Sequence, residues 1–238
     1  MKNILIKLLS YFIFWSSKSR KRFLSKWFID NYFYLLKDGK EIKKKTFSAK
    51  GLKFEIKGKN NIIKISDKAK FTKSKITIAG DNNYIEINET FDEVKLNISV
   101  ERRNNTVFIW GKNSSSVGTT FHLHEDNAKC IVGSNCMFSY NVEVWVTDAH
   151  ALLDKETKKV INKVSEPLTI GDNCWVGYGS LLTKNARLPN NTVVGAGSVV
   201  CKNFEKEYTA IAGNPAKVIK EGVLWDRKSP CRYGKENQ

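Results

Sequence analysis

The fold is decided by residues 170–205, which read IGDNCWVGYGSLLTKNARLPNNTVVGAGSVVCKNFE. This stretch divides into consecutive hexads, each with an aliphatic residue first and only Asn or Gly fourth. The first positions are Ile170, Val176, Leu182, Leu188, Val194 and Val200, and the fourth positions are Asn173, Gly179, Asn185, Asn191, Gly197 and Asn203. Asn and Gly enter left-handed backbone conformations at the least cost, so the period predicts a short strand and a corner in every hexad.

Three such faces close one triangular coil, so the first residue of each hexad is expected to stack on that of the third hexad after it. The expected pairs are Ile170 over Leu188, Val176 over Val194, and Leu182 over Val200. Two earlier hexads, which begin at Val132 and Phe138, follow the same rule with Asn135 and Asn141. The stacked aliphatic residues are therefore predicted to be the core of an all-β solenoid over residues 132–204.

A second, longer period precedes the hexads, over residues 51–131. Two residue types recur here at the same constant interval. The asparagines are Asn61, Asn83, Asn105 and Asn127, and the isoleucines are Ile65, Ile87, Ile109 and Ile131. Alternating apolar and polar residues accompany the repeat, which indicates irregular β-solenoid coils of about 22 residues with longer corners. We expect these coils to carry the hexapeptide coils of 132–204, and residues 205–238 to leave the prism as a C-terminal tail.

Residues 1–50 differ in composition from the rest of the chain. They hold 13 Lys and Arg against 3 Asp and Glu, a balance of +10 within a chain of net charge +16. Apolar residues recur there at helical spacing, beginning with Ile4, Leu5, Leu8, Leu9, Phe12 and Trp15. Residues 1–50 are therefore predicted to be a basic amphipathic helical appendage.

Two roles for this appendage stay open. It could lie on the anionic inner face of the cytoplasmic membrane, where nearby cations are attracted, or it could cap the open end of the solenoid or pack on a neighbouring subunit. Nucleic-acid binding would use the same charge, but no recognition motif accompanies it, so no nucleic-acid partner is expected. The apolar stretch is too short to span a bilayer and lacks a signal-peptide cleavage pattern, which indicates a cytoplasmic or peripheral membrane protein.

The five cysteines, Cys130, Cys136, Cys174, Cys201 and Cys231, are an odd number without metal-binding spacing. A disulfide framework or a zinc ribbon is not expected, and a reducing compartment fits this usage. No metal cofactor is predicted.

Residues 130–220 resemble the hexapeptide-repeat O-acetyltransferases, and most of all those that modify sugars of bacterial capsules and lipopolysaccharides. Four blocks carry the resemblance in order: GSNCMFS at 133–139, TDAH at 147–150, IGDNCWVG at 170–177, and GAGSVV at 195–200 leading to AGNPAKVIK at 212–220. The resemblance implies a left-handed parallel β-helix with a catalytic loop. It also implies a homotrimer that transfers acetyl from acetyl-CoA to a sugar hydroxyl.

The hexads fail over residues 146–168, which predicts a loop that projects from a corner, and loops on a rigid scaffold often carry function. This loop contains His150, one of three histidines in the chain. A neutral imidazole is a suitable base for a hydroxyl that attacks a thioester, and His150 matches the family's catalytic histidine in its Asp-x-His setting. Asp148, Glu143 or a backbone carbonyl could hold its other ring nitrogen.

The resemblance implies further roles around the thioester. It points to the backbone N–H of Tyr178 as an oxyanion donor and to Trp175 as an aromatic beside the reacting centre. It implies that the pantetheine arm lies against a coil of small residues and that basic residues bind the nucleotide. The residues predicted to bind coenzyme A are Gly177, Gly195, Ala196, Gly197, Lys202, Lys217 and Lys220.

The acceptor is expected near the strands that precede the loop. A polar strand face and nearby aromatic residues could contact a sugar, and the residues predicted to do so are His122, Glu125, Tyr140, Asn141 and Trp145. A zinc pair at His122 and His124 would lack a third ligand. Two rival functions remain, an N-acetyltransferase acting on an amino-sugar nucleotide and a non-enzymatic solenoid scaffold.

Overall fold

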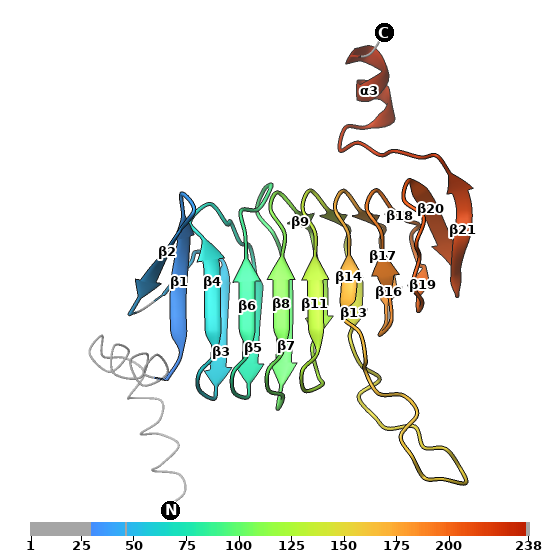
Figure 1. Ribbon diagram of the computed structural model, residues 1–238. Coiled ribbons are helices and arrows are strands. Elements are labelled where there is room, and N and C mark those ends of the chain that lie inside the picture. The colour runs from blue at the N-terminus through green and yellow to red at the C-terminus, as the bar shows by residue number, and fades with distance from the viewer. Residues whose placement is uncertain (1–29, 46, 237–238) are drawn as a thin grey trace, which may run out of the picture.

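The computed structural model of the protein describes residues 30–45 and 47–236, which form a three-sided β-prism (Figure 1). Sheets A and B run along the prism, whereas sheet C begins only at β9, because the first coils contribute isolated bridges on that side. Sheet A consists, in order, of β17 (Arg187–Leu188), β14 (Leu168–Ile170), β11 (Lys129–Val132), β8 (Val107–Trp110), β6 (Tyr84–Ile87), β4 (Ile62–Ser66), β1 (Tyr32–Lys37) and β2 (Lys40–Lys44). Sheet B consists of β19 (Val199–Val200), β16 (Leu181–Leu182), β13 (Val142–Trp145), β10 (Thr119–His122), β7 (Leu96–Glu101), β5 (Ser74–Ala79) and β3 (Leu52–Lys57). Sheet C consists of β21 (Ala216–Glu221), β20 (Thr209–Gly213), β18 (Val193–Val194), β15 (Trp175–Val176), β12 (Met137–Phe138) and β9 (Ser115–Ser116).

The hexapeptide coils stack as the sequence predicts. Strand pairing is parallel, and the Cα partners are Ile170 with Leu188, Val176 with Val194, and Leu182 with Val200. All six of these side chains are buried. This part of the fold prediction is confirmed.

The corners also adopt the predicted conformation, with one exception. Positive φ angles occur at Asn135, Asn141, Asn173, Gly179, Asn185, Asn191 and Gly197. Asn203, the last fourth position, is not among the positive-φ residues; it forms an isolated parallel bridge with Arg187 instead. The regular corner is lost there because the chain leaves the hexad path toward β20.

The wider coils keep their constant interval at first and then shift. Ile65 pairs with Ile87, but Ile87 pairs with Trp110 rather than Ile109, because one extra residue lies between β6 and β8. Side chains of a strand alternate between faces, so this single residue turns Ile109 outward and Trp110 inward. Trp110 is fully buried, whereas Ile109 is half-buried. The isoleucine repeat therefore does not mark one face along its whole length.

Aromatic side chains fill the middle of the prism, where the wide coils meet the hexapeptide coils. The rings of Trp110 and Phe138 are 5.2 Å apart, and those of Phe108 and Phe121 are 4.9 Å apart. A wide coil encloses more space than a hexapeptide coil, and large rings fill that space where aliphatic residues alone would leave voids. The core is one continuous cluster along the prism.

The prediction of a helical appendage over residues 1–50 was wrong for the part that the structure describes. Tyr32–Lys37 and Lys40–Lys44 are antiparallel strands β1 and β2, and β1 pairs in parallel with β4. Phe33 is 1% exposed and packs edge-on against Phe54, so strand alternation buries it where a helix would not. The predicted amphipathic helix falls within residues 1–29, which lie outside the described residues.

The C-terminal segment extends the prism before it leaves it. β20 pairs in parallel with β18, and β21 returns antiparallel to β20, so sheet C continues past residue 205. The following segment crosses back over sheet C and ends in α3 (Pro230–Glu236), which lies away from the prism (Figure 1). In the part of the chain that is described, no helix is long and apolar enough to cross a membrane.

A buried amide ladder crosses the first coils. The side-chain oxygen of Asn31 accepts hydrogen bonds from the backbone N–H and side-chain amide of Asn61, and Asn61 bonds to Asn83 in the same way. The side-chain oxygen of Asn83 then accepts from the N–H and hydroxyl of Thr106, both at 2.9 Å. Each asparagine satisfies backbone groups of the next coil that no strand ladder reaches.

We therefore expect Asn83→Ala to destabilise the protein. The substitution leaves the buried N–H of Thr106 and the side-chain oxygen of Asn61 with fewer partners, and each such group costs about 1–3 kcal/mol. The free energy of unfolding, measured by urea denaturation, should fall by about that amount or more. Asn97→Ala, on the outward face of β7, is the matched control; an equal loss in both variants would contradict a role for the ladder.

Candidate functional site

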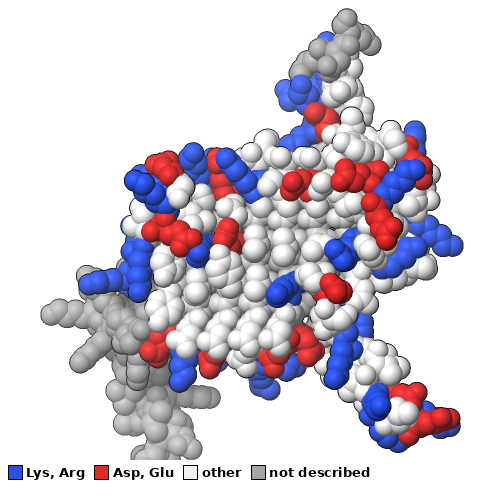
Figure 2. All heavy atoms as spheres, viewed as in Figure 1, with Lys and Arg blue, Asp and Glu red and all other residues white. Residues whose placement is uncertain are grey.

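The loop between β13 and β14 projects well beyond the prism (Figure 1). It folds back on itself as a hairpin, with an isolated antiparallel bridge between Leu153 and Val160 and a backbone hydrogen bond from Ile161 to Leu152. Charged residues of both signs gather toward its tip (Figure 2). The insertion leaves the coils aligned, because β13 and β16 still pair in register on either side of it.

His150 lies at the base of this loop, and its side chain is exposed. The turn before it is tight: Ala149 has a φ of 60°, and the N–H of His150 donates to the carbonyl of Asp148 at 2.7 Å. The imidazole makes no hydrogen bond to any described residue. Both ring nitrogens are therefore open to a substrate or to a further partner.

The two carboxylates that could orient the imidazole are engaged elsewhere. Asp148 forms an ion pair with Lys184 and accepts a hydrogen bond from the side-chain amide of Asn162 at 2.8 Å. Burial acts to raise the pKa of Asp148, but the hydrogen bonds from Lys184 and Asn162 together hold it below its ordinary value of 3.8. Glu143 is bonded to His122 instead, at 2.7 Å.

Trp175 begins β15, and Tyr178 lies at the corner after this strand. They are 38% and 56% exposed. The Tyr178 hydroxyl accepts a hydrogen bond from the side-chain amide of Asn141 at 3.1 Å. The N–H groups of Gly177 and Gly179 are both bonded to carbonyls, whereas the N–H of Tyr178 has no acceptor within the described ranges. It is thus available to a bound oxyanion.

The small residues predicted to line the coenzyme A groove stack tightly. A Cβ on Gly177 would lie 2.7 Å from the backbone nitrogen of Ala196, and one on Gly195 would lie 2.9 Å from the Cβ of Ala212. Gly197 turns a corner with a φ of 68°. Coil-to-coil packing alone thus excludes larger side chains at Gly177, whatever else binds there.

The basic residues predicted for the nucleotide lie at the C-terminal end of the prism. Lys217 and Lys220 are exposed on β21, opposite Ala212 and Ala210 of β20. The ammonium of Lys202 lies 5.2 Å from the centre of the Phe204 ring. None of the three lysines forms an ion pair with residues in the described segments. They are therefore free to meet an anionic ligand.

The structure brings two of the predicted acceptor residues, His122 and Trp145, into one cluster on the outer face of sheet B. The ring centres of His122 and Trp145 lie 3.8 Å apart in a stacked arrangement. The carboxylate of Glu143 is hydrogen-bonded to Nε2 of His122. His124, on the same polar strand face, packs edge-on against His122 at 5.2 Å and bonds to the Ser99 hydroxyl at 3.0 Å. Within residues 30–45 and 47–236 no cluster of three or more metal-binding side chains occurs.

The other three predicted acceptor residues, Glu125, Tyr140 and Asn141, stand outside this cluster. Glu125 accepts a hydrogen bond from the hydroxyl of Thr147 at 3.1 Å and so connects the end of β10 to the start of the loop. Tyr140 is 59% exposed at a corner of sheet C, and its carbonyl accepts the N–H of Gly179. Tyr140 and Asn141 therefore lie beside Tyr178 rather than beside His122.

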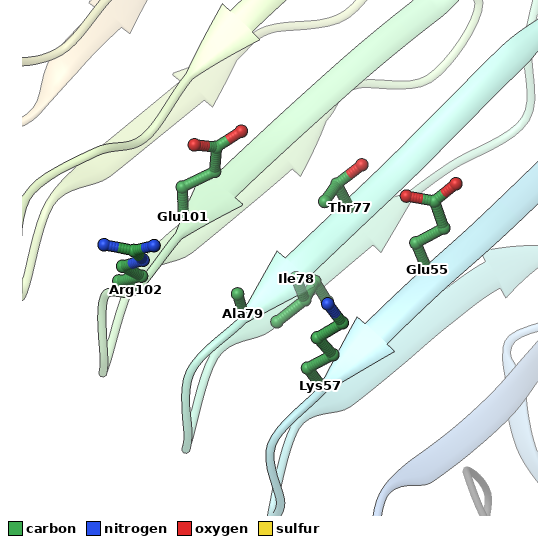
Figure 3. Close-up of a pocket in the computed structure, with 7 residues that line it drawn as sticks. All are labelled: Glu55, Lys57, Thr77, Ile78, Ala79, Glu101 and Arg102. Atoms are coloured by element: carbon green, nitrogen blue, oxygen red, sulfur yellow. The ribbon is translucent and has the colours of Figure 1, made fainter. Parts of the chain in front are cut away.

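A separate shallow pocket lies on sheet B, across β3, β5 and β7 (Figure 3). Its lining consists of Glu55, Lys57, Thr77, Ile78, Ala79, Glu101 and Arg102. None of the predicted site residues lines it, and it belongs to the first coils rather than to the coils that carry the loop. It is not the candidate site.

Sequence reasoning missed two tail residues that reach the site region. The indole N–H of Trp225 donates to the carbonyl of Asn173 at 2.5 Å, and its ring centre lies 6.2 Å from that of Trp175. The guanidinium of Arg227 donates to the Ser115 hydroxyl at 2.6 Å and to the carbonyl of Cys136 at 2.9 Å. Both lie outside the repeats, so no periodicity marks them.

Comparison with known proteins points in the same direction as this geometry. No family model matches the sequence. The polysialic acid O-acetyltransferase of Escherichia coli O1:K1 is 30% identical over 113 residues, which are 48% of this chain and 36% of that protein. The galactoside O-acetyltransferase of E. coli K12 is 32% identical over 119 residues, 48% of this chain and 57% of that one. The chain thus covers less than two thirds of these curated relatives.

The solved structures cover more of the chain. The crystal structure of the polysialic acid-specific acetyltransferase NeuO superposes with a TM-score of 0.72, at 25% identity, over 87% of both chains. The chain is thus similar in sequence and in fold to proteins named as acetyltransferases. The polysialic acid O-acetyltransferase OatWY matches at a TM-score of 0.54 and 25% identity, over 74% of this chain and 92% of that one. The predicted fold class, a left-handed parallel β-helix, is confirmed, and the relatives' names support an acyltransferase.

The half-buried His124 of the sheet B cluster makes the stability of the folded protein depend on pH. Burial lowers the pKa of His124 below 6.5, electrostatic interactions with His122 and Arg103 act in the same direction, and Glu101 opposes them. The unfolded chain therefore takes up the proton first as the pH falls below 6.5. The stability contributed by neutral His124 is present above that pH and is lost below it.

We expect wild-type protein to lose more stability than His124→Gln between pH 7.5 and pH 5, because glutamine cannot titrate. Urea midpoints across this range provide the measurement. The exposed His150→Gln variant controls for removal of an imidazole as such. Parallel pH curves for wild type and His124→Gln would show that the cluster does not exclude a charged His124.

Proposed function

We propose that the protein is an acetyl-CoA-dependent O-acetyltransferase that acetylates a hydroxyl of a bacterial surface glycan. The observation that carries the proposal is the exposed His150, in an Asp-x-His turn at the base of a loop, on a prism related to O-acetyltransferases. An imidazole with both nitrogens open can accept a proton from an acceptor hydroxyl. The polysialic acid named for two relatives supports a glycan acceptor.

In the proposed reaction, His150 removes the proton of the acceptor hydroxyl as its oxygen attacks the thioester carbonyl. A C–O bond forms, and the carbonyl becomes an oxyanion to which the open N–H of Tyr178 donates. Collapse of the intermediate breaks the C–S bond, and the leaving thiolate of coenzyme A takes the proton from the imidazolium. Trp175, on β15, would shield this reacting centre from water.

The donor and acceptor would occupy different faces. Coenzyme A would lie along the coil of Gly195, Ala196 and Gly197, with its phosphates toward Lys202, Lys217 and Lys220. The acceptor sugar would meet the polar and aromatic residues predicted to bind it, which are His122, Glu125 and Trp145 near the base of the loop and Tyr140 and Asn141 at the corner beside Tyr178. Aromatic rings with one polar edge suit a sugar, which has apolar faces and a rim of hydroxyls.

Two wider features belong to the same proposal. The groove beside sheet C would be completed by a neighbouring subunit, so the active form would be a homotrimer. The protein would act in the cytoplasm, with the basic residues 1–29 at the inner membrane face, where glycan precursors carried on lipid are accessible. Their net charge, seven Lys and Arg without Asp or Glu, favours an anionic surface.

Removal of the base tests the assignment. His150→Ala should reduce kcat by about 10²–10⁴-fold, because general-base assistance contributes that much. The assay is release of free coenzyme A from acetyl-CoA with oligosialic acid or a galactoside as acceptor. The melting temperature should stay near that of wild type, since the side chain is exposed. A folded His150→Ala protein with full activity would remove His150 from the mechanism.

Cofactor binding can be tested without turnover. Coenzyme A at about 100 times its Kd should stabilise the parent protein by about 2.7 kcal/mol, visible as a rise in melting temperature. The Lys217→Ala/Lys220→Ala protein should show a much smaller rise, because two phosphate partners are removed. The matched control is Lys57→Ala/Lys59→Ala, which removes two exposed lysines from the first coils. No rise in the parent protein would count against an acetyltransferase.

A further inference from the structure

Two residues that the motifs do not mark tie the base of the loop to the prism. Lys184 follows β16, and its ammonium pairs with the carboxylate of Asp148 and donates to the backbone carbonyl of Asn162 at 2.9 Å. Asp148 stands at the outgoing strand of the loop and Asn162 at its returning strand. A single cation from the rigid coil thus holds both strands of the hairpin.

Asn162 completes the clamp from within the loop. Its side-chain amide donates to the Asp148 carboxylate and to the backbone carbonyl of His150, both at 2.8 Å. Its side-chain oxygen accepts the N–H of Leu152, also at 2.8 Å. The residues on both sides of His150 are therefore bonded to one amide, although the imidazole itself is hydrogen-bonded to neither Asn162 nor Lys184.

The surroundings favour an ordered contact over a loose surface ion pair. The side chain of Lys184 is 15% exposed, and that of Asp148 is 36% exposed. An isolated surface pair stabilises little, because two flexible chains must be fixed in water. Here the ammonium has two acceptors on separate strands and the carboxylate has two donors, which gives one geometry rather than many.

The turn that carries His150 needs such support. Ala149 is in the left-handed region, which a residue with a Cβ adopts at some cost in energy. The turn has no neighbouring strand, since it lies past the end of β13. The bonds from Asn162 to Asp148 and His150 are contacts that span this residue and hold it in place.

We propose that Asn162 and Lys184 are positioning residues that fix the backbone of His150 for acetyl transfer. The inference rests on the proposed function, in which His150 is the base. A catalytic group on a projecting loop is useful only if it meets the substrate at one geometry, and misplacement by about 1 Å can cost about 10²-fold in rate.

The experiment compares steady-state kinetics of Lys184→Met, Lys184→Arg, Asn162→Ala and Lys163→Met. Lys184→Met and Asn162→Ala should lower kcat by about 10–10²-fold, with KM for acetyl-CoA changed by less than about threefold, because the donor site is elsewhere. Lys184→Arg keeps the cation and should recover most of the activity. Lys163→Met removes an exposed lysine of the same loop and should behave as wild type.

A second measurement follows the loop itself. Trypsin should cut the lysines of the loop tip faster in Lys184→Met and Asn162→Ala than in wild type, while the melting temperatures stay close. Unchanged kcat in both variants would overturn the proposal, as would an equal loss in Lys163→Met. If wild type transfers no acetyl group but the clamp variants open the loop, the proposed function fails and the clamp is only structural.

Discussion

The whole structure depends on the stacking of successive coils in one register. Each coil bonds to the next through parallel ladders, and the aliphatic residue at each strand lies on its counterpart one coil away. This is possible only if the chain turns through the same angle at every corner. Asn and Gly at positive φ provide that turn, so a residue type chosen for backbone conformation sets the position of the side chains that form the core.

The same stacking explains how a long loop can be added without disturbing the prism. An insertion at a corner leaves the ladders on both sides intact, and the strands before and after the loop still pair in register. The loop carries the exposed His150, whereas Trp175 and Tyr178 lie on β15 and at the corner after it. The base of the loop is held to the coil by separate contacts, those of Asn162 and Lys184.

The sequence was informative about the site where a motif coincides with the repeat. Trp175 and Tyr178 could be placed on one coil because their spacing follows the hexads, and the loop was predicted from the failure of that spacing. The stack of His122 on Trp145 and the clamp at Lys184 were not predicted as units. Both the stack and the clamp join residues that lie about one coil or more apart in the sequence. The side chains that meet across coils depend on how many extra residues the corners between them contain.

The sequence by itself determined the corners, the strand length and the inward residues of the hexapeptide coils, because these follow from local conformational preferences that recur in every hexad. The tertiary structure decided what the repeat does not control. One extra residue turned Trp110 inward, Tyr32–Lys37 joined the prism as a strand, and the tail returned to place Arg227 on Ser115. These outcomes depend on contacts between segments without a common period, and only the folded chain brings such segments together.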